Sequence, residues 1–99
     1  MAFMEISVVP IGTGTTSLSK HVAAILKVIK ESGLPFQLHD MGTTVEGKAE
    51  ELLGLAARAH EAAFENEEVK RVYTVIKLDD RRDKTTKMGD KTSSVKEKL

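Results

Sequence analysis

The side chains best suited to bind a small molecule in this 99-residue chain lie in its middle, between two glycines. Thr43 and Thr44 supply hydroxyl groups, Glu46 supplies a carboxylate, and Gly42 and Gly47 flank them. Hydroxyls donate and accept hydrogen bonds and a carboxylate accepts them, so this stretch could hold a polar ligand. The same composition also fits a plain hairpin turn followed by the start of a helix.

A second group combines acidic and basic residues: Asp79, Asp80, Arg81, Arg82 and Asp83. Its carboxylates could ligate a cation, transfer a proton, or pair with arginines of a neighbouring subunit. Mixed charge at the end of a strand is typical of a solvated or interfacial ion-pair network. We therefore predict ion pairs here, and retain Asp79 and Asp80 as carboxylates that could face a ligand.

The three histidines do not form a metal-binding pattern. His21, His39 and His60 are expected on separate elements, and the chain contains no cysteine. Without ligands at a suitable spacing, no metal site is predicted. The lack of cysteine also excludes disulfides and thiol nucleophiles.

Two short motifs match catalytic or phosphate-binding patterns only in part. Residues 17–20 have the Ser-x-x-Lys spacing of certain acyl-enzymes, but the companion motifs are missing, so we interpret them as a helix start. Gly12 and Gly14 precede a helix and could cradle a phosphate, but the rest of that pattern is absent. Because no nucleophile is paired with a base, we predict that the protein is not an enzyme and needs no cofactor.

Alternating strands and helices must position these side chains. Apolar residues switch from a two-residue repeat to a helical repeat and back along the chain. Pro10 lacks an amide donor, so we expect the first strand to leave the sheet there. Ser17 fits a helix N-cap, Gly33 the residue after a helix, and Asn66 a left-handed turn that ends the next helix. The predicted strands span residues 3–11, 36–39, 43–46 and 69–78, and the predicted helices start near residues 17, 48 and 90 and end near residues 32, 65 and 99.

This order predicts an α+β ferredoxin-like β-α-β-β-α-β sandwich, in which a four-stranded antiparallel sheet carries both long helices on one face, plus a short C-terminal helix. The length fits one domain, residues 1–99. The other sheet face would be bare, yet Val9, Ile11, Tyr73 and Val75 would lie on it. An apolar patch of this kind needs a cover, so we predict a symmetric homo-oligomer formed sheet to sheet.

Charge and hydropathy exclude several partners. The 15 basic and 15 acidic side chains cancel, which leaves no net field to attract nucleic acid or an anionic membrane. No apolar stretch approaches the length of a membrane span, and the N-terminus lacks the pattern of a secretion signal. We therefore expect a cytoplasmic protein.

Four blocks of the sequence, residues 9–12, 17–23, 41–47 and 76–83, together resemble the thiamine-binding protein family. The resemblance covers nearly the whole chain in order, with small departures at Leu78 and at residues 66–68. It implies a ferredoxin-like fold and sheet-paired dimers that assemble into tetramers. It also implies that thiamine, or its hydroxymethylpyrimidine moiety, binds between subunits.

Strand alternation narrows the choice of ligand-facing residues. Neighbouring strand residues face opposite sides, so at most one of Thr43 and Thr44 points into a pocket, whereas Thr44 and Glu46 share a face. We favour that pair as ligand-facing, with Gly42 letting the backbone approach a flat ring. Lys77 is expected to be an ion-pair partner. The predicted ligand-binding residues are Gly42, Thr43, Thr44, Glu46, Asp79 and Asp80.

The predicted function is non-catalytic binding of thiamine or hydroxymethylpyrimidine at a subunit interface, for buffering, carrying or sensing. The alternative is a structural or regulatory oligomer without a small-molecule ligand.

Overall fold

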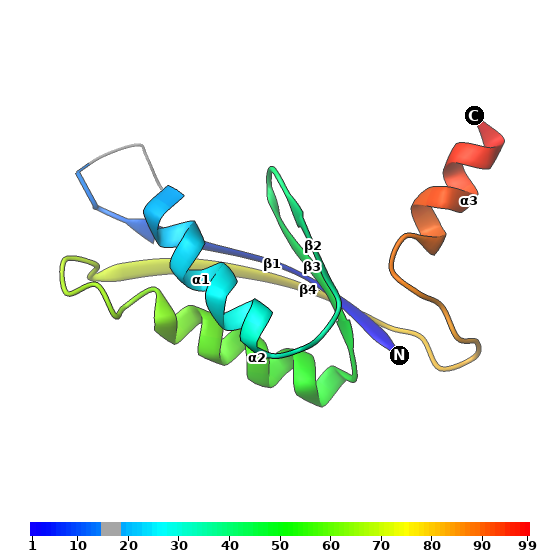
Figure 1. Ribbon diagram of the computed structural model, residues 1–99, viewed down its shortest axis with the longest axis horizontal. Helices are drawn as coiled ribbons and strands as arrows, with labels where there is room; N and C mark the ends of the chain where they lie inside the picture. The colour runs from blue at the N-terminus through cyan, green and yellow to red at the C-terminus, as the bar shows by residue number, and fades with distance from the viewer. Residues whose placement is uncertain (15–18) are drawn as a thin grey trace.

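The computed structural model describes residues 1–14 and 19–99, and its elements follow the order β-α-β-β-α-β-α (Figure 1). The predicted N-cap Ser17, and with it the first half of the Ser-x-x-Lys motif, lies outside the described residues. The strands are β1 (Ala2–Ile11), β2 (Phe36–His39), β3 (Gly42–Gly47) and β4 (Arg71–Asp80), and the helices are α1 (Ser19–Glu31), α2 (Ala49–Ala62) and α3 (Asp90–Lys98).

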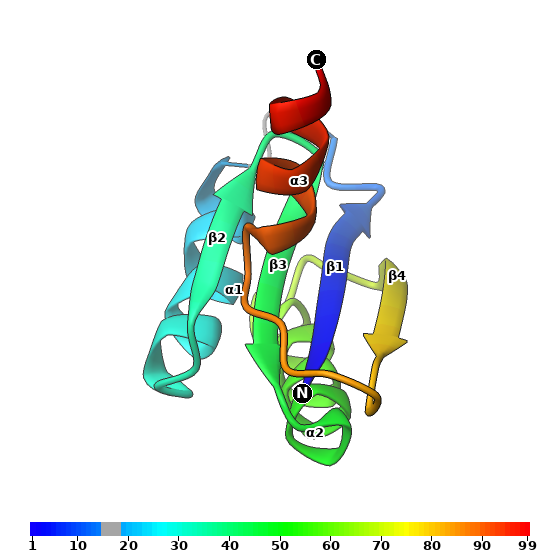
Figure 2. The same ribbon diagram turned by 90° about the vertical axis from the view of Figure 1, so that its right-hand side faces the viewer.

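The four strands form one antiparallel sheet in the order β2-β3-β1-β4. Helices α1 and α2 cover one face of this sheet, and α3 lies on the opposite side (Figures 1 and 2). The predicted α+β ferredoxin-like sandwich is confirmed. Two features of this arrangement position the candidate site, namely the bare sheet face and the helix in front of it.

The hydrophobic core lies between the sheet and helices α1 and α2. Met4 and Val45 are opposite each other on β1 and β3, and both side chains are fully buried in this core. Leu52 and Leu55 of α2 and Ile29 of α1 pack in the same cluster. Because side chains alternate along a strand, this packing determines which residues of each strand point to the open face.

The prediction that β1 leaves the sheet at Pro10 is wrong. The strand continues to Ile11, which is paired with Arg71 of β4. The pairing of β1 with β3, by contrast, ends at Ile6. Beyond Ile6 the strand has one neighbour instead of two, and a residue without an amide donor is tolerated on such an edge.

The strand β4 ends later than predicted, at Asp80 rather than residue 78. Ala2 and Phe3 of β1 still pair with Asp80 and Asp79, so the ladder extends into the acidic residues. Asp79 and Asp80 are consequently strand residues that face opposite sides of the sheet.

The end of α2 also differs from the prediction, because the helix stops at Ala62 and Asn66 is not left-handed. Among the described residues, positive φ angles occur only at glycines. The Asn66 side-chain oxygen instead accepts a hydrogen bond from the backbone N–H of Glu68 at 3.0 Å, which closes the turn. At the end of α1 the prediction is confirmed, since Gly33 has a φ of +75°.

Two glycines should respond in opposite ways to replacement by alanine. A Cβ at Gly42 would lie 3.0 Å from the Ile6 carbonyl oxygen. Gly42→Ala must therefore push β3 away from β1, and should lower the free energy of unfolding by about 1–3 kcal/mol. At Gly54, inside α2, the nearest atom would be Nη1 of Arg58 at 3.5 Å. Gly54→Ala should raise the free energy of unfolding by about 0.5–1 kcal/mol, because alanine favours the helix.

Urea unfolding of both variants and of the parent protein measures the two changes in the free energy of unfolding. A Gly42→Ala protein as stable as the parent would contradict the close approach of β1 and β3.

Candidate functional site

The sheet face opposite α1 and α2 carries two rows of side chains that could form a site. The strand register aligns Gln37, Thr44, Glu5 and Lys77 in one row that crosses all four strands. The adjacent row on the same face consists of Glu46, Phe3 and Asp79. The open face thus presents a polar row beside an aromatic ring with a carboxylate residue on each side.

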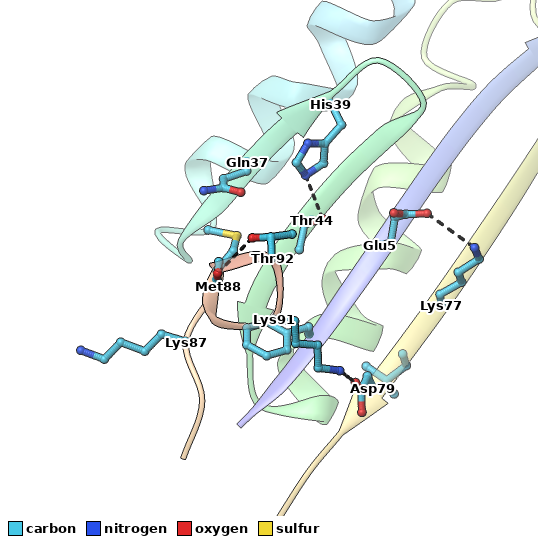
Figure 3. Close-up of a pocket in the computed structure, with 13 residues that line it drawn as sticks. Glu5, Gln37, His39, Thr44, Lys77, Asp79, Lys87, Met88, Lys91 and Thr92 are labelled. Carbon is cyan, nitrogen blue, oxygen red and sulfur yellow. Dashed lines mark hydrogen bonds and ion pairs between the residues drawn. The ribbon is translucent and has the colours of Figure 1, made fainter. Parts of the chain in front are cut away.

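A cavity of about 300 Å³ lies between this face and the start of α3 (Figure 3). Its volume is at the lower end of the range of about 300–1,000 Å³ that is typical of small-molecule sites. Both rows contribute to its floor, and the chain just before and within α3 forms the opposite wall. The lining residues are Phe3, Glu5, Gln37, His39, Thr44, Lys77, Leu78, Asp79, Lys87, Met88, Gly89, Lys91 and Thr92.

Three polar side chains of the cavity come from the β2–β3 hairpin. His39 Nε2 and Thr44 Oγ1 share a hydrogen bond of 3.1 Å. Gln37 lies opposite Thr44 on β2, and its side-chain amide can donate and accept hydrogen bonds. These three side chains could bind a flat heterocycle that has donors and acceptors along one edge.

Four charged side chains of the cavity form two ion pairs. Glu5 Oε1 lies 3.9 Å from Nζ of Lys77, which is its neighbour across β1 and β4. The predicted ion-pair role of Lys77 is therefore confirmed. Nζ of Lys91, on α3, donates a hydrogen bond to Oδ2 of Asp79 (Figure 3). This contact links the start of α3 to the end of β4.

The rest of the acidic and basic group forms exposed ion pairs, as predicted. Nε and Nη2 of Arg81 donate to the two carboxylate oxygens of Asp83 at 2.6 and 2.9 Å. Nη2 of Arg82 donates to Asp80 at 2.9 Å. The hydrogen bond from each arginine lowers the pKa of the carboxyl group that it contacts. Asp80 and Asp83 are thus ionised at neutral pH and already paired with arginines.

The structure brings together only part of the predicted site. Thr44 and Asp79 line the cavity, and Glu46 shares their face without lining it. Thr43 is buried on the helix side, where it and Gly42 line a separate hollow beside α1. Asp80 faces away from the cavity and binds Arg82. The predicted common face of Thr44 and Glu46 is confirmed by the register, as is the opposite orientation of Thr43.

Among the sheet residues of the cavity that sequence reasoning missed, Phe3, Glu5, Gln37 and His39 lie on the open face. A signal for them was available, because strand alternation puts these positions on the bare face together with Thr44. The wall formed by residues 87–92 had no such signal, since nothing in the sequence indicates where α3 lies relative to the sheet.

Two histidines have partners within the chain. His39 binds Thr44 as described above, and Nδ1 of His60 on α2 lies 2.7 Å from Oγ1 of Thr74 on β4. Within residues 1–14 and 19–99, no three histidine or acidic side chains are grouped closely enough to hold a metal ion. In the same residues, no helix has the length and apolar character needed to cross a membrane.

These features define an α+β protein of the ferredoxin-like class with a ligand-sized cavity on its open sheet face. The chain belongs to the thiamine-binding protein family, whose model matches residues 4–96.

Relatives and solved structures agree with this assignment. The chain is 41% identical over 100 residues to a UPF0045 protein of Methanothermobacter thermautotrophicus, and both chains are covered completely. It is 38% identical over 103 residues to a UPF0045 protein of Bacillus subtilis, covering all of this chain and 98% of the relative.

Among solved structures, a hypothetical protein of Methanocaldococcus jannaschii superposes with a TM-score of 0.87 at 31% identity, covering 97% of this chain and 96% of the other. A Thermotoga maritima protein has the same fold, with a TM-score of 0.78 at 21% identity over 95% of this chain and 97% of the other. The name of the Thermotoga protein proposes a role for it in thiamine biosynthesis or salvage.

Proposed function

We propose that this protein binds thiamine or its hydroxymethylpyrimidine moiety in the cavity under α3, without catalysing a reaction, as a cytoplasmic protein that buffers, carries or senses the compound. The observation that carries the proposal is the composition of the cavity. A polar row, an aromatic ring and a carboxylate surround a volume suited to a small heterocycle. Membership of the thiamine-binding family and the name of the Thermotoga structure support it.

The chemistry of the ligand matches the two rows of side chains. An aminopyrimidine presents donors and acceptors along one edge, which Gln37 and Thr44 can satisfy. The flat ring can stack on Phe3 at the cavity floor. The positive charge of a thiazolium ring is favoured beside Asp79. Glu46 remains in the proposal as a second carboxylate next to Phe3, although it does not line the cavity of a single chain.

Gly42 and Thr43 have structural roles. Gly42 lets β3 approach the Ile6 carbonyl, and Thr43 is buried against the helices. Of the predicted set, we therefore propose Thr44 and Asp79 as the ligand-binding residues of the cavity, with Glu46 as a second carboxylate beside it.

Thermal unfolding with added ligands tests the proposal. A ligand at 100 times its dissociation constant adds about 2.7 kcal/mol to the free energy of unfolding. For a domain of this size, the melting temperature should rise by roughly 10 °C or more. We expect such a rise with thiamine or hydroxymethylpyrimidine, and none with an unrelated heterocycle at the same concentration. No rise with thiamine, its phosphates or the pyrimidine would favour a structural or regulatory oligomer instead.

The proposed assembly is a homo-oligomer in which a second copy covers the rest of the open face. Tyr73 and Val75 of β4 and Ile11 of β1 are exposed there. In Figure 2, α3 stands in front of β3 and leaves the distal part of β1 and β4 uncovered. A second copy seated on these residues would lie beside the cavity, which agrees with ligand binding near a subunit interface. Sheet-paired dimers that assemble into tetramers are the proposed form.

Light scattering after size exclusion tests the assembly with a matched pair of variants. Val75→Asp places a charge in the proposed interface and should shift the protein toward monomers, because an unpaired charge in an apolar contact is costly. Val22→Asp should leave the mass unchanged, since Val22 has almost the same exposure, 38% against 40%, but lies on α1. A wild-type protein that is monomeric at micromolar concentration would exclude the assembly.

A further inference from the structure

The acidic groups that face the cavity are already neutralised by the protein's own lysines. Glu5 is paired with Lys77, and both belong to adjacent strands of the sheet. Asp79 is paired with Lys91, which belongs to α3. A cationic ligand that enters the cavity must therefore compete with an internal ammonium group for the Asp79 carboxylate.

The two pairs differ in how firmly the lysine is held. Lys77 lies in a ten-residue strand that is paired with β1 along its length. Helix α3 buries none of its residues, and it lies apart from the body of the protein in Figure 1. Exposed ion pairs of this kind contribute little to stability, so the contact between Lys91 and Asp79 can open at small cost.

We propose that Lys91 is a built-in competitor for the positive charge of the ligand. The ammonium of Lys91 occupies the carboxylate that a cationic ligand would otherwise use, and a bound cation displaces it and releases the start of α3 from the sheet. This inference rests on the proposed function and specifies the charge of the ligand that the site exchanges for Lys91. The site takes a thiazolium cation in exchange for Lys91, whereas a neutral pyrimidine binds without that exchange.

If Lys91 instead bound the ligand directly, replacing it would change the affinity in the opposite direction. If the ligand carried an anionic group toward α3, such as a phosphate ester, Lys91 would bind it directly and removal of the lysine would weaken binding. The two roles are thus separated by the direction of one change in affinity. The favoured role follows from the geometry, because Lys91 reaches to Asp79 (Figure 3).

Isothermal titration calorimetry on the full chain tests the inference with Lys91→Gln and, as a matched control, Lys96→Gln. Lys96 has the same charge on the same helix but does not line the cavity. We expect Lys91→Gln to tighten thiamine binding about two- to fivefold, the affinity equivalent of one exposed ion pair. Binding of neutral hydroxymethylpyrimidine should stay unchanged, and Lys96→Gln should leave both affinities unchanged. In an Asp79→Asn background, the effect of Lys91→Gln should disappear.

The possible failures are distinguishable. If wild-type protein binds thiamine and Lys91→Gln binds it equally or more weakly, the competitor role is overturned and the proposed function stands. Weaker binding confined to thiamine phosphate would assign Lys91 to an anionic group. If the wild type binds neither thiamine nor the pyrimidine, the proposed function falls and this inference falls with it.

Discussion

Replacing Leu52 by alanine is expected to lower the free energy of unfolding by about 3 kcal/mol, within the range of about 2–5 kcal/mol for fully buried leucines. Leu52 has no exposed surface and belongs to the core cluster under the sheet. The change removes apolar contacts and leaves a cavity that the fully buried neighbours cannot fill. For a small domain, the melting temperature should fall by roughly 10 °C or more.

The adjacent residue provides the control. Leu53 is on the same helix but is 50% exposed, so Leu53→Ala should change stability far less. Both variants should be compared at one protein concentration, because an oligomer's stability depends on concentration. Equal losses for the two variants would contradict the orientation of α2 on the sheet, and with it the assignment of the open face.

Replacing Asp79 by asparagine is expected to weaken thiamine binding by about 1.5 kcal/mol, which is roughly tenfold in the dissociation constant. The change removes the carboxylate that attracts the ligand's cation. The Lys91 side chain is 61% exposed, so its ammonium turns to solvent once this partner is gone. Stability without ligand should change little, because the ion pair is exposed.

Asp80→Asn is the matched control for this prediction. It makes the same chemical change at the next residue, which faces the other side of the sheet and is paired with Arg82. Its thiamine affinity, measured by calorimetry, should equal that of the wild type. If both variants lost thiamine affinity to a similar extent, the overall negative charge at the end of β4 would be responsible, and not a contact inside the cavity.

Most of the fold follows from local signals in the sequence. The strand at Phe36–His39 has the predicted bounds, because Pro35 precedes it and its residues alternate clearly. Gly33 ends α1 with the expected left-handed backbone. The errors at Pro10 and Asn66 come from contacts that a local pattern does not contain. Pro10 stays in the strand because β1 is no longer paired with β3 at that point. Asn66 closes its turn by accepting a hydrogen bond from the Glu68 N–H with its side chain.

The site was harder to predict than the fold. Its residues are brought together partly by alternation within a strand and partly by pairing between strands that are far apart in the sequence. Alternation alone separates Thr44 and Glu46 from Thr43, and the register confirms that separation. The row that joins Gln37 to Thr44, Glu5 and Lys77 requires the strand order and the register of three ladders. Helix α3 buries none of its own residues, so no hydrophobic pattern in it could predict where it lies relative to the sheet.

Every prediction about the site depends on the proposal that thiamine binds between the open sheet face and α3. A crystal structure of the protein grown with saturating thiamine tests it most directly. We expect ligand density in the cavity, with the pyrimidine edge at Gln37 and Thr44, the ring on Phe3 and the thiazolium near Asp79. Density at another position, such as the hollow beside α1 that Thr43 lines, would contradict it.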